Sequence, residues 1–129
     1  MKSDADSSLF DRVGGEAWFV ALVDRFYHLV EDDPVLRPLY PEDLSGPRQH
    51  LAGFLAQRWG GPSKYSEARG HPRLRMRHAP FAIGQAERDV WFQHMSAALA
   101  AGQLDDADRA ELRAFFDSTS TMLINREEP

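Results

Sequence analysis

The chain contains no cysteine. This absence excludes a disulfide framework, a thiolate zinc site, a cysteine-held iron–sulfur cluster and a cysteine nucleophile. Any bound metal must therefore use histidine, carboxylate or tyrosine ligands.

Long hydrophobic runs are also missing. The longest uninterrupted apolar stretch runs from Ala17 to Val23, whereas a membrane-spanning helix needs about 20 such residues. The polar segment Met1–Ser8 lacks the apolar core of a signal peptide. We therefore expect a cytoplasmic protein without a membrane partner.

The chain is also short, at 129 residues and 14.6 kDa, with 43% hydrophobic and 27% charged residues. These values suit one folded domain and leave no room for a second core. We expect a single domain over residues 1–129, with loose ends at 1–8 and 126–129.

Basic residues are scarce except in the middle of the chain. The formal net charge is −5, but residues 1–46 carry −6, residues 47–88 carry +6 and residues 89–129 carry −5. A basic segment between two acidic ones suits a small anionic ligand better than a long polyphosphate. A plain solvated face explains the charges about equally well.

No alternating β pattern occurs, and apolar residues recur at helical spacing instead. We predict helices over about residues 16–31, 46–59, 83–101 and 105–125, the second one capped by Ser45, with a single helical turn around Leu39 and Tyr40. Four such helices predict an all-α fold of antiparallel helix pairs.

Residues 62–82 form the one long segment without a period, and we expect at most one or two short helical turns in it. Loops of more than about 12–15 residues are usually functional in compact domains. This loop places His71 and His78 near apolar residues. His78 suits a haem ligand, although the neighbouring residues alone favour an ordinary half-buried histidine. Zinc binding by the pair lacks a defined third ligand.

Three side chains combine a predicted inward position with a hydrogen-bond donor. They are Tyr27 in the first helix, Tyr40 in the following turn and Trp91 in the third long helix. Backbone carbonyls could satisfy each of them, but three donors that meet in one cavity would indicate a polar ligand. His28 and His94 are expected at the surface or rim.

These residues together resemble the group II truncated haemoglobins. The most specific stretch, Phe54 to Phe81, reads FLAQRWGGPSKYSEARGHPRLRMRHAPF, and the helix that carries Trp91 follows it. Gly14-Gly15, Phe26-Tyr27 and Leu39 to Glu42 also occur in the family's order. The resemblance covers nearly the whole chain and implies a two-over-two helical sandwich, a globin-like fold that encloses haem b.

The resemblance also implies roles for individual residues. His78 corresponds to the proximal iron ligand, and the distal residues correspond to Tyr27, Tyr40, Leu51 and Trp91. Pro47 occupies the place of a distal histidine and cannot donate a hydrogen bond. The implied haem contacts are Pro47, His50, Leu51, Phe54, Tyr65, Met76, Arg77 and Phe81.

The implied function is reversible binding of O2 and other diatomic ligands, with high affinity and slow release, because hydrogen bonds stabilise the partial negative charge of bound O2. An alternative is a haem enzyme that removes nitric oxide or peroxide with an external reductase. A third is a helical module without haem whose residues 69–78 bind an acidic partner or nucleic acid, which the net charge disfavours. We expect a monomer or homodimer that binds no nucleic acid.

Overall fold

The computed structural model describes residues 8–126, whose regular secondary structure is entirely helical, with no strand among them. The long helices are α2 (Glu16–Glu31), α3 (Ser45–Arg58), α6 (Gln85–Ala100) and α7 (Asp106–Met122). The short ones are α1 (Leu9–Val13), α4 (Lys64–Arg69), α5 (Leu74–His78) and a 3-10 turn, Arg37–Leu39. The predicted helices are thus confirmed to within a few residues at their ends.

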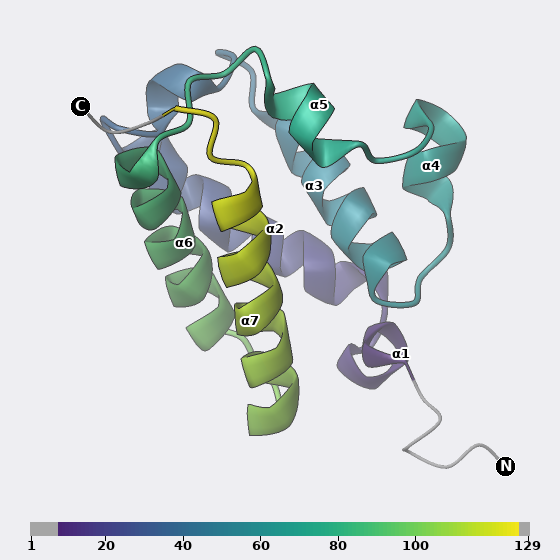
Figure 1. Ribbon diagram of the computed structural model, residues 1–129. Helices are drawn as coiled ribbons and strands as arrows, with labels where there is room; N and C mark the ends of the chain where they lie inside the picture. The colour runs from purple at the N-terminus through teal and green to yellow at the C-terminus, as the bar shows by residue number, and fades with distance from the viewer. Residues whose placement is uncertain (1–7, 127–129) are drawn as a thin grey trace, which may run out of the picture.

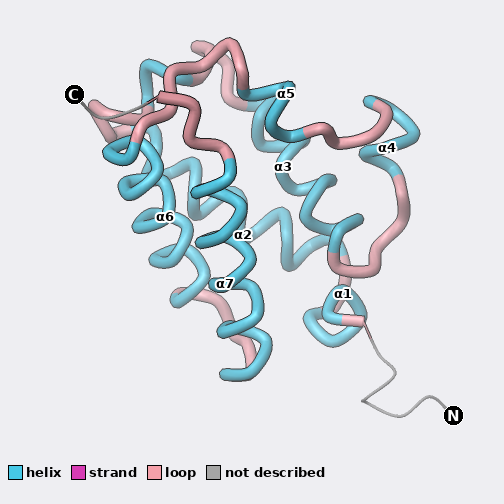
Figure 2. The backbone as a smooth tube through the Cα atoms, in the orientation of Figure 1, coloured by secondary structure: helices cyan, strands magenta, loops and turns pink. Residues whose placement is uncertain are grey.

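The long helices form two layers of two (Figures 1 and 2). Helix α2 packs against α3 in one layer and α6 packs against α7 in the other, while α2 also contacts α6 across the layers. The all-α, globin-like, two-over-two fold is therefore confirmed. None of the helices in the described part of the chain is long and apolar enough to cross a membrane.

The apolar stripe of α2 forms the centre of the core. Phe19, Leu22, Val23, Phe26 and Val30 recur at three- and four-residue intervals, and each is at most 1% exposed. One face of α2 can therefore pack against both α3 and α6, because side chains three and four residues apart lie on the same face of a helix.

The first predicted loose end is partly wrong. Residues 1–7 lie outside the described residues, but Ser8 caps α1, because its hydroxyl accepts a hydrogen bond of 3.1 Å from the Asp11 amide. Helix α1 has only five residues, too few for a hydrophobic period. Its Arg12 reaches Asp108 of α7 at 2.8 Å and so ties the start of the chain to the second layer.

The second predicted loose end covers residues 126–129, of which 127–129 lie outside the described residues. Arg126 is held, since its amide donates a hydrogen bond of 3.1 Å to the Ile83 carbonyl. The predicted cap of α3 is also different. Ser45 is the first helical residue, and the carboxylate of Asp43 accepts hydrogen bonds from both its amide and its hydroxyl.

Gly61 should not tolerate a side chain. A Cβ atom there would lie 2.7 Å from the Ala56 carbonyl and 2.7 Å from the Phe10 ring. We expect Gly61→Ala to lower the free energy of unfolding by about 1–3 kcal/mol, as overpacking does in well-packed sites. Denaturant unfolding measures this change. Gly46→Ala is the control, because nothing lies within 4 Å of its Cβ position; equal losses in both variants would contradict the steric explanation.

Candidate functional site

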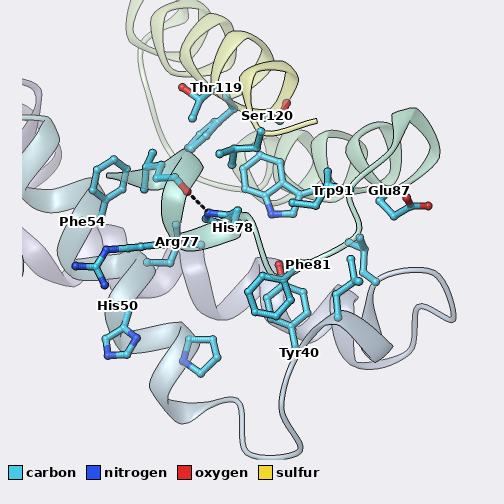
Figure 3. A pocket seen from close by; sticks show the side chains of 18 of the residues that line it. Tyr40, His50, Phe54, Arg77, His78, Phe81, Glu87, Trp91, Thr119 and Ser120 are labelled. Carbon is cyan, nitrogen blue, oxygen red and sulfur yellow. Dashed lines mark hydrogen bonds between the residues drawn. The ribbon is translucent and has the colours of Figure 1, made fainter. Parts of the chain in front are cut away.

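The two layers enclose a cavity of about 330 Å³ that the long loop, α4 and α5 close on one side. Its walls are mostly apolar, and its lining comes from every long helix. Figure 3 shows His78, Trp91 and Tyr40 directed toward the same space.

Nearly all predicted site residues line this cavity. They are Tyr27, Tyr40, Pro47, His50, Leu51, Phe54, Tyr65, Arg77, His78, Phe81 and Trp91. The structure thus brings together residues from five separate segments of the chain.

Met76 is the exception, and the expectation that it forms part of the cavity wall is wrong. Its side chain is 59% exposed and does not line the cavity. The reason is helical geometry, since each residue of an α-helix turns by about 100°. His78 faces inward, so Met76, two residues earlier on α5, faces outward.

His78 is held in a defined orientation by its own helix. Its Nδ1 lies 2.7 Å from the carbonyl oxygen of Leu74, four residues earlier (Figure 3). A backbone carbonyl can only accept, so Nδ1 carries a proton, and in the neutral imidazole the lone pair is then on Nε2. The ring of Phe81 packs edge-on at 6.4 Å between centroids. The Leu74 carbonyl was not predicted as part of the site, although its place one helical turn before His78 is the signal for it.

Tyr27, Tyr40 and Trp91 form one polar group within the apolar cavity. The rings of Tyr27 and Tyr40 meet edge-on, with centroids 5.4 Å apart. Burial raises the pKa of Tyr40 to about 12, and hydrogen bonding from Trp91 and Tyr27 offsets part of that effect. Burial, and after it the neighbouring Tyr40, also raises the pKa of Tyr27. Both phenols therefore remain protonated donors at neutral pH.

The mouth of the cavity is cationic. Arg77 donates to the Pro72 carbonyl at 2.7 Å and to the Arg69 carbonyl at 2.6 Å. Arg69 lies 2.9 Å from Nε2 of His50, and burial together with Arg69 and Arg77 lowers the pKa of His50. The imidazole of His50 is therefore neutral and accepts the bond from Arg69. Arg69 was not predicted as a site residue, although it lies in the basic segment.

The remaining histidines lie away from the cavity. His28 is exposed, as expected, and so is His71. His94 was expected at the surface or rim, but it is half-buried and its Nε2 lies 2.6 Å from Asp33. No group of three or more metal-ligating side chains occurs within residues 8–126, so zinc binding by His71 with His78 has no support.

Asp33 fastens the turn that leads to Tyr40. Its other carboxylate oxygen accepts hydrogen bonds from the amides of Val35 and Leu36, at 2.8 and 3.1 Å. The bond to His94, with those two amide bonds, lowers the pKa of Asp33. The turn is thereby joined to α6, one helical turn after Trp91.

We expect Asp33→Asn to lower the free energy of unfolding by about 1 kcal/mol at neutral pH, because the amide keeps an acceptor but loses the charge. A lowered folded-state pKa stabilises the fold above the unfolded value of about 3.9 and loses that contribution as the pH falls. The difference between variant and parent should therefore vanish in strong acid. Unfolding curves at several pH values measure it, and a constant difference would contradict the assignment.

A profile of the bacterial-like globins matches residues 8–125. A group 2 truncated haemoglobin of Bacillus subtilis is 37% identical over 114 residues, which cover 88% of this chain and 86% of that protein. The chain belongs to the group II truncated haemoglobins. Membership of this family implies a haem cofactor and a small diatomic ligand such as O2.

Solved structures of related globins agree with the fold. The haemoglobin of Chloroflexus aurantiacus superposes with a TM-score of 0.92 at 47% identity, covering 94% of this chain and 100% of that one. An oxygen-avid truncated haemoglobin of Bacillus subtilis superposes with a TM-score of 0.87 at 34% identity, covering 92% of this chain and all of that one.

The side chains of the cavity fit a haem group. The walls are apolar, as a porphyrin requires, His78 offers a free imidazole nitrogen, and cationic side chains stand at the mouth where carboxylates can reach water. No side chain of the cavity lining conflicts with the binding of haem, the cofactor implied by the truncated haemoglobin family.

Proposed function

We propose that this globin holds haem b through His78 and binds O2 reversibly, with high affinity and slow release. The observation that carries the proposal is the convergence of Tyr27, Tyr40 and Trp91, from three segments, on the cavity that His78 also lines. Haem, when bound, supplies an iron atom with one coordination position open to a diatomic ligand.

His78 is suited to the role of axial ligand. The bond from Nδ1–H to the Leu74 carbonyl, 2.7 Å long, fixes the tautomer and the plane of the ring. Such a partner raises the basicity of the ligating nitrogen and orients it before the cofactor arrives. Because the chain has no cysteine, thioether attachment of haem is excluded, which favours haem b.

The mouth of the cavity is suited to the propionates. Arg69 and Arg77 carry charge there, and their guanidinium groups lie 5.9 and 6.0 Å from the ring centre of Tyr65. Charge-assisted hydrogen bonds from arginine to a carboxylate are among the strongest polar contacts in proteins. His50 and Tyr65 add neutral donors at the same edge.

The distal donors are suited to O2 because they are preformed and neutral. O2 gains partial negative charge when it binds ferrous iron, and the phenol and indole protons can donate to it. Pro47 and Leu51, which also line the cavity, offer no side-chain hydrogen bond. The oxygen-avid relative of Bacillus subtilis has the same fold and is consistent with tight binding here.

The test is the release of O2 from the purified ferrous protein. We expect a haem spectrum with a Soret band and an O2 dissociation rate in stopped-flow mixing that is slow compared with transport globins. A fast release would overturn the proposal of high affinity. Steady turnover of nitric oxide or peroxide with an external reductant would instead establish the enzymatic alternative.

A further inference from the structure

Helix α5 has two chemically different faces. Leu74, Arg77 and His78 line the cavity, as residues three and four apart on one helix can. Arg75 and Met76 are exposed, as is Arg73, which immediately precedes the helix. Figure 1 shows α5 at the edge of the molecule, between α4 and the segment that leads to α6. One short helix thus separates His78 from solvent.

The outward arginines have no partner within the described chain. Neither the Arg73 nor the Arg75 side chain forms a hydrogen bond or an ion pair with residues 8–126. The arginine and lysine side chains of that region that form ion pairs are Arg12, Arg48, Lys64, Arg88 and Arg109. Two unpaired guanidinium groups beside an exposed methionine form a small cationic surface with an apolar centre.

The backbone of Arg73, at the start of α5, is in a strained conformation. Its backbone φ is 44°, the only positive value at a residue other than glycine between residues 8 and 126. This left-handed conformation is uncommon for side chains other than asparagine and aspartate, and strain of this kind gathers at functional sites. An arginine therefore occupies a backbone conformation that glycine or asparagine adopts more easily.

The remainder of the molecule is acidic. Residues 1–46 and 89–129 carry −6 and −5, against +6 for residues 47–88. An acidic partner is therefore repelled by most of the surface and attracted to the basic segment, which selects one orientation of encounter. A nucleic acid fits less well, since a patch two residues wide offers no track for a polyphosphate.

We propose that Arg73, Arg75 and Met76 form the docking surface for an acidic electron-carrier protein that reduces the haem iron. Methionine and arginine are enriched in the centres of protein interfaces, where flexible apolar contact and charge act together. One electron passes from the carrier to ferric iron, which becomes ferrous; no covalent bond forms or breaks and no proton is required.

The site of docking lies close to the electron's destination. Met76 lies two residues before His78, and the carbonyl oxygen of Leu74, which lies between Arg73 and Arg75 in the chain, is 2.7 Å from Nδ1 of His78. This inference rests on the proposed function, because ferric iron must be reduced before O2 can bind it.

The experiment uses the haem-loaded chain and a bacterial flavodoxin as the probe, an acidic protein that carries a single electron per transfer. The variant is Arg73→Asn with Arg75→Gln, because asparagine accepts the left-handed backbone and glutamine retains helix propensity. We expect reduction by reduced flavodoxin, followed at the Soret band, to slow about ten-fold at low ionic strength. Binding of oxidised flavodoxin, measured by calorimetry, should weaken to a similar extent.

Arg113→Gln is the control for the loss of a positive charge elsewhere, since it removes one charge, against two in the α5 variant, from the exposed side of α7. Its rate should stay within about two-fold of the parent, and dithionite should reduce all variants equally. Equal losses in the control and the α5 variant, or a rate independent of salt, would overturn the docking surface while the Soret band upholds haem binding. Loss of DNA or anionic-vesicle binding instead of flavodoxin binding would also overturn it. A chain without a Soret band would refute both proposals.

Discussion

Replacing His78 by glycine should leave a chain that folds but holds haem about 100-fold more weakly or worse. Loss of a supporting partner of a metal ligand already costs about 10–100-fold in affinity, and here the ligand itself is removed. A titration with hemin, followed at the Soret band, measures the effect. Added imidazole should restore the band in part, because the small molecule can occupy the space that the ring leaves.

His71→Gly is the control for this experiment. That histidine lies seven residues earlier in the same loop, but its side chain is exposed and does not line the cavity. Its variant should bind hemin as the parent does. If His78→Gly retained haem with an unchanged Soret maximum, the assignment of the axial ligand would be wrong.

The second large effect concerns the release of O2. We expect Tyr27→Phe and Trp91→Phe each to speed dissociation about ten-fold, which corresponds to about 1–2 kcal/mol for one lost hydrogen bond. Both side chains interact with the Tyr40 hydroxyl, so the double variant should show less than the product of the single effects. Stopped-flow dissociation rates of the three variants give this coupling.

Trp18→Phe is the control, because the indole of Trp18 donates to the Gln103 carbonyl at 3.3 Å and lies outside the cavity lining. It should leave the rate unchanged. Since burial raises the pKa of Tyr40 to about 12, the parent should release O2 at one rate between about pH 6 and about pH 10. Unchanged rates in all variants would contradict a distal hydrogen-bond network.

The sequence was sufficient to predict the fold, which depends on local patterns, and it named most of the predicted residues that line the cavity. The stripe of α2 has a helical period over four turns, and Gly60-Gly61-Pro62 ends α3 by backbone chemistry alone. His78 and Trp91 stand in a stretch similar to one family, so their roles followed from that resemblance. The prediction of one or two short helical turns in the long loop was confirmed as α4 and α5.

The predictions of side-chain position were wrong for Met76 and incomplete for His94, because a few contacts set the direction of each side chain. Met76 has the polarity of a cavity residue, but α5 has a single turn that must direct His78 inward, and that requirement turns Met76 to solvent. His94 has polar neighbours in sequence, while its partner Asp33 is 61 residues away. Contacts over such distances leave no periodic signal in the chain.

The sequence by itself thus determined the helices, because a helical period is a local pattern, whereas the role given to His78 rested on the family resemblance and stays a prediction. Only the tertiary structure decided which donors share the Tyr40 hydroxyl and which face of α5 meets solvent. Each of these depends on the direction of a side chain, and that direction is set by packing between segments far apart in the chain.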